Sequence, residues 1–434
     1  MTKDGFLGRN RLMSTRLHLL LLAAGTVPLA FTQAGPNYGD DLAFLKKHTP
    51  IVELSSGEAR VAIAPAWQGR VMTSTAAGAE GAAFGWINRE VIEIGIKPEA
   101  QRDGLQKHIH VFGGEERLWL GPEGGPFALF FPPKVPQTFD NWKTPALMDT
   151  EPFEIEGAAK PTSVSFRRKA SLPNRAGTVL SFELRRDISL AEAPALARVC
   201  GGELPEGIKA VGYETRNNVK NTGDKAWTKE TGAPSIWLLG MFKPTDGTTI
   251  VIPIRVGTSD DDLGPKANTS YAGFPPIPED RVRITKPSRL SMALFFKGDG
   301  KARGKLGIPP KRQTGLAGSW QADLGVLTLV KMAGDRDPAT AAWPYVDSQW
   351  KEDGDPFAGD VINSYNDGAP EPGAKPLGPF YEIETSGPAM LLAPGASFTH
   401  AQTTVHLTGP RPALDAVAKR TLGVGLDEIE KALP

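Results

Sequence analysis

Short runs of strand-forming residues, separated by turns, fill most of this 434-residue chain and limit the folds open to it. Ser235–Phe242 and Thr248–Val256 are almost wholly apolar, which indicates strands buried on both faces. Turns are frequent because the chain contains 48 Gly and 38 Pro residues, which interrupt helices and strands. Helical patterns do not alternate with the strands, as they would in an α/β protein. The sequence therefore predicts an all-β fold, a large and mostly antiparallel sandwich, and no linker marks a second domain.

The N-terminus has the pattern of a secretory signal peptide. Basic residues precede the apolar run Leu17–Phe31, and small residues follow at Thr32–Ala34. We place the signal peptide at residues 1–34, with Met13 as an alternative start. A membrane anchor is the alternative, although the run is shorter than the roughly 20 residues of a membrane span. We expect a periplasmic or secreted protein that is free of the membrane after signal cleavage.

Composition excludes several kinds of partner and linkage. Acidic and basic residues balance, 49 against 49, so no excess charge points to nucleic acid or to an anionic membrane. Cys200 is the only cysteine, which rules out an internal disulfide and leaves no lipobox cysteine after the apolar run. No Cys-x-x-Cys pair or Gly-rich phosphate loop is present, so we expect neither a metal ion nor a cofactor.

Few helices are expected, and the two candidates lie near the ends of the mature chain. Asp41–Lys47 has the composition of a short helix, and residues 413–433 carry the clearest helical pattern, with a break at Gly423–Gly425. We therefore divide the mature chain into a β-sandwich domain at residues 35–412 and a C-terminal helical tail at residues 413–434. Between them, Asp360–Asp367 reads as a loop rich in amide and aromatic groups.

Two strand-like runs in the stretch Phe380–Leu407 bring carboxylates and imidazoles together. In the first run Glu382 and Glu384 lie on one face, because alternate residues of a strand point to opposite sides. In the second run His400 and His406 share a polar face with an amide side chain. Polar faces of this kind on neighbouring strands predict a small-molecule cleft.

A second polar stretch supplies groups that a sugar site needs. His108 and His110 share one face of a predicted strand, Arg117 and Trp119 share a face beyond a Gly-Gly break, and Glu123 follows in a turn. Guanidinium and carboxylate groups form paired hydrogen bonds to hydroxyls, and an indole packs against the C–H face of a pyranose. The His-x-His pattern is also half of a metal site, and polar residues beside a strand bulge are the simplest alternative.

Four motifs lie in order along the chain. Gln68–Val71 comes first, then Gly113–Trp119, Tyr213–Asp224, and Glu384-Thr385-Ser386 with its Pro-Gly turn at Leu392–Gly395. In this order they resemble the motifs of the galactose mutarotase-like superfamily, over most of the mature chain. The resemblance implies a large antiparallel β-supersandwich, to which the sequence adds a short C-terminal helix. It also implies a carbohydrate ligand and Glu384 as the base of an aldose 1-epimerase-like isomerase.

Two departures from the pattern of that superfamily concern the chemistry. The resemblance implies a histidine acid in the strand at Gly232–Phe242, but this segment contains no histidine and has Trp237 in that neighbourhood. Ser386 replaces the amide residue that usually completes the motif of the base. The acid must then come from elsewhere, and His110 and His400 are candidates because an imidazole titrates near neutral pH.

We therefore predict a carbohydrate site with Glu384, His110 and His400 as catalytic residues. The residues predicted to bind the sugar are Arg70, His108, Arg117, Trp119, Glu123, Trp237, Glu382 and His406. The alternatives are a non-catalytic carbohydrate-binding protein, a polysaccharide lyase or glycoside-processing enzyme, and a purely structural surface protein. The sequence leaves the sugar and the oligomeric state open.

Overall fold

The structure is a computed structural model that describes residues 36–102, 106–257, 263–286, 292–333, 343–370 and 373–434. All of them belong to one compact unit, Gln33–Pro434. The predicted signal peptide lies outside the described residues. No helix in the described part of the chain is long and apolar enough to cross a membrane.

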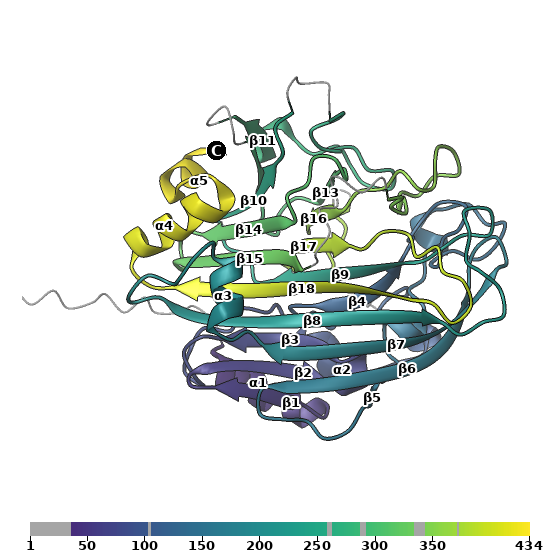
Figure 1. The fold of residues 1–434 in the computed structure, drawn as a ribbon, viewed down its shortest axis with the longest axis horizontal. Helices are drawn as coiled ribbons and strands as arrows, with labels where there is room; N and C mark the ends of the chain where they lie inside the picture. The colour runs from purple at the N-terminus through teal and green to yellow at the C-terminus, as the bar shows by residue number, and fades with distance from the viewer. Residues whose placement is uncertain (1–35, 103–105, 258–262, 287–291, 334–342, 371–372) are drawn as a thin grey trace, which may run out of the picture. The chain divides into compact units, whose positions relative to one another are not determined.

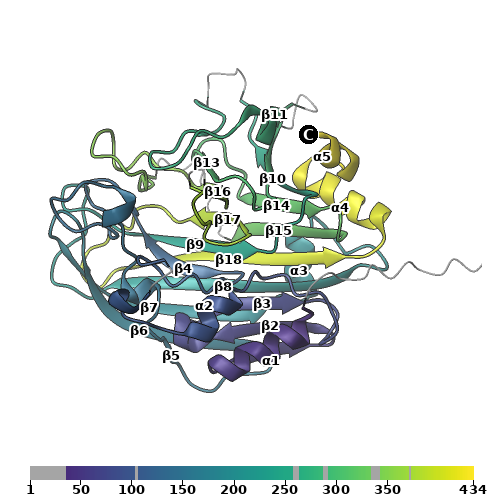
Figure 2. The same cartoon turned by 180° about the vertical axis from the view of Figure 1, so that it is seen from behind.

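The described residues form three sheets in which neighbouring strands run antiparallel (Figure 1, Figure 2). The three-stranded sheet has the order β1 (Val52–Ser56), β2 (Ala59–Ala64), β3 (Arg70–Thr75). The five-stranded sheet has the order β13 (Gly304–Ile308), β16 (Ile362–Asn366), β17 (Tyr381–Ser386), β9 (Ser235–Phe242), β4 (Arg117–Gly121). The ten-stranded sheet has the order β11 (Val282–Thr285), β12 (Met292–Lys297), β10 (Thr248–Ile254), β14 (Leu316–Gln321), β15 (Val326–Ala333), β18 (Ser397–Thr408), β8 (Lys209–Asn221), β7 (Val179–Leu190), β6 (Ser163–Pro173), β5 (Glu154–Ile155).

The three-stranded and five-stranded sheets join edge to edge and form one layer. Val71 of β3 and Glu116, which precedes β4, exchange backbone hydrogen bonds of 3.2 Å in both directions. This layer packs on the ten-stranded sheet, where the hydroxyl of Tyr381 lies 2.8 Å from that of Ser319. The predicted all-β antiparallel sandwich is confirmed.

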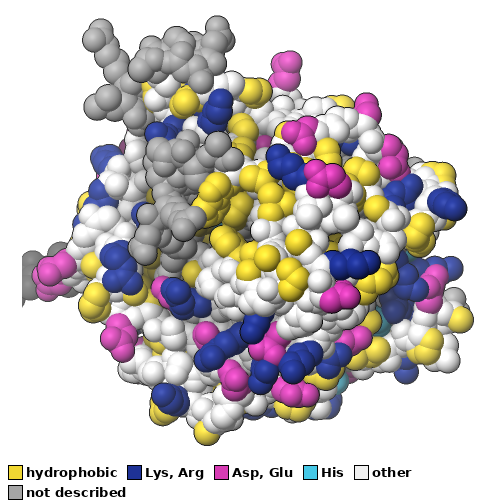
Figure 3. Space-filling view, turned by 45° about the vertical axis from the view of Figure 1, so that its right-hand side comes forward, with side chains coloured by type: hydrophobic (Ala, Val, Ile, Leu, Met, Phe, Trp, Pro, Cys, Tyr) yellow, Lys and Arg dark blue, Asp and Glu magenta, His cyan; other side chains and the backbone are white. Residues whose placement is uncertain are grey.

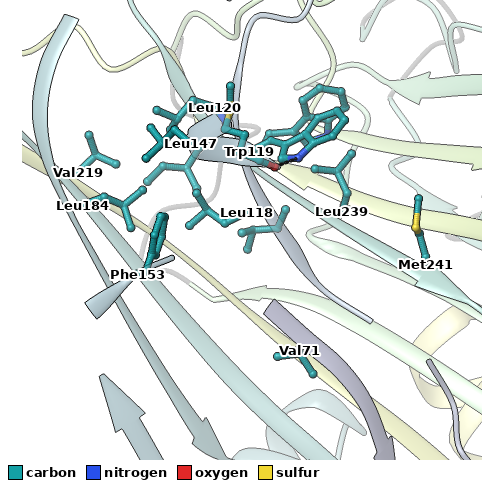
Figure 4. Close-up of a cluster of buried hydrophobic side chains, with 14 of the residues drawn as sticks. Val71, Leu118, Trp119, Leu120, Leu147, Phe153, Leu184, Val219, Leu239 and Met241 are labelled. Carbon is teal, nitrogen blue, oxygen red and sulfur yellow. Dashed lines mark hydrogen bonds between the residues drawn. The ribbon is translucent and has the colours of Figure 1, made fainter. Parts of the chain in front are cut away.

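Apolar side chains from both layers fill the space between them. The core includes Leu118 of β4, Leu184 of β7 and Val219 of β8, which Figure 4 shows in part. Every residue of β9 is buried, as its continuous apolar run predicted. Each fully buried side chain of this size stabilises the fold by roughly 1.5–3 kcal/mol, so the sandwich is held mainly by this core.

Short helices pack against the sheets. α1 (Tyr38–His48) begins at a capping box between Asn37 and Asp40, and α2 (Arg89–Ile94) and α3 (Ala193–Val199) are shorter. At the C-terminus α4 (Arg411–Leu422) and α5 (Leu426–Lys431) pack on the ten-stranded sheet (Figure 1). Gly423, with a φ of 76°, ends α4, so the predicted helical tail and its break are confirmed.

Two local predictions are wrong. Residues 108–112 form no strand, because the chain turns at Gly113, with a φ of 85°. A Cβ on Gly113 would come within 2.2 Å of the Trp86 carbonyl oxygen, so the Gly-Gly break allows a close backbone contact. Asp360–Asp367 is not a loop, since it contains β16, whose amide and aromatic side chains are buried between β13 and β17.

A buried ion pair connects the two layers. Arg186 of β7 donates hydrogen bonds to Glu116 at 2.8 Å and to Asn217 at 2.7 Å, and neither charged side chain has any exposed surface. Burial raises the pKa of Glu116, and the Arg186 guanidinium opposes that shift. The interior therefore tolerates the carboxylate only because its partner is in place.

We predict that Arg186→Leu lowers the free energy of unfolding by about 3–5 kcal/mol, since it leaves a buried carboxylate unpaired. The matched control is Arg185→Leu, at the next position of β7, where the side chain is 52% exposed. That change should cost less than about 1 kcal/mol. Urea unfolding of both variants measures the difference, and equal losses would contradict the prediction. Adding Glu116→Gln to Arg186→Leu should recover part of the loss.

Candidate functional site

One face of the five-stranded sheet points away from the ten-stranded sheet and lines a cleft. Alternate residues of a strand point to opposite sides, so Leu118 enters the core while Trp119 faces the cleft beside Leu239 (Figure 4). The cavity in this cleft has a volume of about 80 Å³. The strand residues that line it are Arg117, Trp119, Trp237, Leu239, Met241, Lys305, Tyr365 and Glu382. Residues outside the strands that line it include Glu123, Phe139, Trp142, Phe274, Arg303 and Trp350.

Strand register sets the rows of side chains on this face. Leu239 of β9 lies opposite Arg117 on one side and opposite Glu384 on the other. Trp237 lies opposite Trp119 in the same way. Residues that are far apart in sequence therefore become neighbours across the sheet, and their side chains share the cleft face.

Two carboxylates of β17 form ion pairs on the cleft face. Arg117 Nη2 donates a hydrogen bond to Glu382, and both side chains are almost fully buried. Lys305 Nζ lies 3.3 Å from Glu384 Oε2, and Trp237 Nε1 donates to the same oxygen at 2.9 Å. Burial raises the pKa of Glu382 to about 8, and the Arg117 guanidinium only partly opposes that rise. Each charge is thus held in position by a partner from another strand.

Aromatic rings surround these charges. The Arg117 guanidinium lies 4.6 Å from the ring centre of Trp119, and the Lys305 ammonium lies 4.6 Å from that of Trp237. The two indoles meet edge to face, with centres 5.6 Å apart. Phe274 also lies 5.7 Å from the ammonium. The cleft therefore combines flat apolar faces with cations that stack against them.

Glu123 is the third carboxyl group of the cleft and differs from the other two. It follows β4, lines the cavity, and is buried. Among the described residues no Lys or Arg forms a salt bridge with it, and burial raises its pKa. Lys305 lowers that pKa while the charge on Glu384 raises it. This carboxyl group is therefore the one most readily protonated without breaking an ion pair.

Glu384 lies behind the cavity wall. It has no exposed surface and is not among the residues that line the cavity, whereas the Trp237 indole and the Lys305 ammonium, which do line it, hydrogen-bond to its Oε2 atom. Its Oε1 atom has no hydrogen-bond partner among the described residues.

The structure brings together six of the residues predicted for the sugar site. Arg117, Trp119, Glu123, Trp237 and Glu382 line the cavity, and Glu384 lies directly behind it. The two stretches that carry them are joined in space because β9 lies between β4 and β17.

His400 and His406 do not reach the cleft. Both lie on the face of β18 that packs against the other layer, where their polar neighbours satisfy them. His400 Nε2 is 2.9 Å from the Thr385 hydroxyl, and His406 Nδ1 is 2.9 Å from the Thr328 hydroxyl. The polar face predicted for this strand exists, but it faces the interior of the sandwich.

Three other predicted residues also lie outside the cavity lining. Arg70 is buried beneath the Gly-Gly turn, where it donates to the Gly113 carbonyl at 3.1 Å. His110 pairs with Asp149 at 2.8 Å and lines a second cavity beside the cleft. His108 is half-buried against Phe139, with ring centres 4.9 Å apart, at the mouth of the cleft. In the described part of the chain, no three His, Cys, Asp or Glu side chains form a group that could hold a metal ion.

Several cleft residues were not predicted from the sequence. Lys305 is the most important of them, since it neutralises Glu384. In its strand, Gly304–Ile308, Lys305 faces the cleft and Leu306 faces the core. The strand is short and carries two glycines, so this alternation gives only a weak signal in the sequence. Arg303 and Trp350 come from loops, where no periodicity exists to indicate direction.

Comparisons with known proteins agree with the fold. The model of a family of unknown function, DUF6786, matches residues 36–433. No curated protein matches the chain. Among solved structures, the Slr1438 protein from Synechocystis sp. PCC 6803 is 12% identical with a TM-score of 0.45, covering 83% of this chain and 96% of that one.

Two other solved structures come from lactobacilli. A galactose mutarotase-like protein from Lactobacillus casei ATCC 334 is 10% identical with a TM-score of 0.42, covering 82% of this chain and 100% of that one. A galactose mutarotase related enzyme from Lactobacillus acidophilus is 10% identical with a TM-score of 0.38, covering 82% of this chain and 97% of that one. The predicted resemblance is confirmed as a similarity of fold.

The burial of His400 predicts a pH dependence of stability. Burial lowers its pKa from 6.5 to about 4 in the folded state. Between these values the unfolded chain binds a proton that the folded chain does not, so stability falls as the pH drops from 6.5 to 4. The loss amounts to about 3 kcal/mol.

Urea unfolding of the wild type and of His400→Gln, each at pH 7 and at pH 4, measures this loss. The difference in unfolding free energy between the two proteins should shrink by about 3 kcal/mol at the lower pH. An unchanged difference would contradict the assignment of His400 as a buried neutral residue.

Proposed function

The chain belongs to the DUF6786 family, whose function is unknown, and we propose that it binds a carbohydrate in the cleft of its five-stranded sheet. The observation that carries the proposal is the arrangement of aromatic faces and buried, paired charges around one cavity. Indole faces pack against the C–H side of a sugar ring, and charged groups form strong hydrogen bonds to its hydroxyls.

The charged groups suit hydroxyls because they are fixed before a ligand arrives. Arg117 holds Glu382 through one nitrogen, and its Nε atom has no hydrogen-bond partner among the described residues. Lys305 holds Glu384 in the same way. A hydroxyl that bridges such a pair gains hydrogen bonds without isolating either charge in the interior.

The narrow cavity restricts the ligand. At about 80 Å³ it is smaller than the roughly 300–1,000 Å³ of common small-molecule pockets. A sugar ring therefore enters only when side chains at the mouth turn aside. Arg303 lines the cavity and is partly exposed, so its side chain has the freedom to do so.

A second candidate function, exchange of the anomers of an aldose, is favoured by the environments of Glu123 and Glu384. A base takes the proton of the anomeric hydroxyl while an acid protonates the ring oxygen, so that the C1–O5 bond breaks and a carbonyl forms at C1. Glu123 suits the acid, because burial raises its pKa and no salt bridge fixes its charge within the described residues. Glu384 suits the base, because its Oε1 atom has no hydrogen-bond partner there. When the ring closes again on the other face of C1, the base returns its proton to the C1 oxygen and the acid recovers its proton from O5.

A screen of monosaccharides by thermal unfolding tests the binding proposal, because a ligand of the folded state raises the unfolding temperature by mass action. Glu382→Gln should weaken binding at least about tenfold, since Arg117 loses its charged partner. Glu183→Gln, which changes a partly exposed carboxylate on the ten-stranded sheet, is the control and should bind like the wild type. If no sugar stabilises the wild type, the proposal is wrong.

Anomer exchange followed by NMR separates an enzyme from a binding protein. We expect Glu384→Gln and Glu123→Gln each to slow exchange by about 10²–10⁴-fold at saturating sugar, beyond any effect of these changes on sugar binding. Glu352→Gln, at an exposed carboxylate paired with Arg175, should leave the rate unchanged. Binding by the wild type without exchange would exclude the isomerase and leave a carbohydrate-binding protein.

A further inference from the structure

The mouth of the cleft carries an exposed aromatic ring. Phe139 lines the cavity, yet 39% of its surface is exposed. The other large hydrophobic side chains with comparable exposure in the described part of the chain lie away from the cavity; they are Ile94, Ile96, Ile155, Val179, Ile284 and Leu391. Phe139 therefore combines exposure with a place on the ligand path.

The Phe139 ring is held in a fixed orientation. It begins a short 3₁₀ helix, Phe139–Asn141, which is closed by a 3.1 Å hydrogen bond from the Asn141 amide to the Thr138 carbonyl. The ring stacks on Trp142, with centres 6.1 Å apart and planes at 14°. His108 meets it edge to face at 4.9 Å. Because the ring is already held in place, the Phe139 side chain loses little conformational freedom when a ligand contacts it.

The same row of rings continues into the cavity. Trp142 stacks on Trp350, with centres 6.2 Å apart and planes at 24°, and both indoles line the cavity. Phe274, which lies 6.4 Å from Trp350, extends the row toward Lys305. Flat apolar rings that follow one another from the solvent to the buried charges match the repeated C–H faces of linked sugar rings.

We propose that the ligand of the cleft is a chain of at least two sugar units. One terminal unit enters the cavity, and the next unit lies on Phe139 beside His108. The inference rests on the proposed carbohydrate-binding function and extends it to the class of ligand. The small volume of the cavity, about 80 Å³, supports it, because a second ring has no room inside and must remain at the mouth. His108, at the rim, offers an imidazole to a hydroxyl of that outer unit.

Calorimetric titration of matched sugars tests this arrangement. Glucose is compared with cellobiose and maltose, and galactose with β-1,4-galactobiose, so that both ends of each disaccharide match its monosaccharide. The wild type should bind at least one disaccharide about tenfold more tightly than the matching monosaccharide. Phe139→Ala should weaken disaccharide binding more than monosaccharide binding and so remove most of that gain, whereas Phe139→Tyr should keep the gain. Val179→Ala, at an exposed apolar residue away from the cleft, is the control and should behave as the wild type.

Two results would overturn the inference while leaving the binding proposal intact. One is equal affinity of the wild type for the monosaccharide and all of its disaccharides. The other is a loss in Phe139→Ala that is the same for both kinds of sugar, which would place the ring against the inner unit. If neither monosaccharides nor disaccharides bind, the proposed function itself fails and this inference fails with it.

Discussion

The register of β17 between β9 and β16 decides which side chains the cleft receives. Tyr381, Ile383 and Thr385 face the ten-stranded sheet and are buried there, so Glu382 and Glu384 must face the other way. A slip of one residue would place both carboxylates in the apolar core and the apolar residues in the cleft. The packing of one face of this strand thus determines the chemistry of the other.

Two buried ion pairs in this protein link separate strands. Arg186 with Glu116 joins the two layers, and Arg117 with Glu382 joins β4 to β17 across β9. A lone charge in either place would cost several kcal/mol, so each pair requires that both strands are correctly placed. On the surface, by contrast, acidic and basic side chains are interspersed over the face shown in Figure 3, where solvent screens them.

Some residues of the cleft could be predicted from the sequence, and others were expected there wrongly, for identifiable physical reasons. Arg117 and Trp119 were predicted together because strand alternation is local and the resemblance to a known superfamily marked the same stretch. His400 and His406 were expected in the cleft because a polar face usually meets solvent or ligand. In this fold the polar face of β18 instead meets polar groups of the opposite layer, such as Thr385 and Glu115.

The sequence by itself determined the class of the fold, the alternating faces of its strands and the position of the C-terminal helices, because strand periodicity, turn residues and helix caps act between near neighbours in the chain. Only the tertiary structure decided that Lys305 neutralises Glu384, that His400 and His406 are enclosed and that Phe139 stands at the mouth of the cleft. These contacts join residues that lie far apart in sequence. Their formation depends on sheet order and on which face is buried, and neither property is encoded in any single segment.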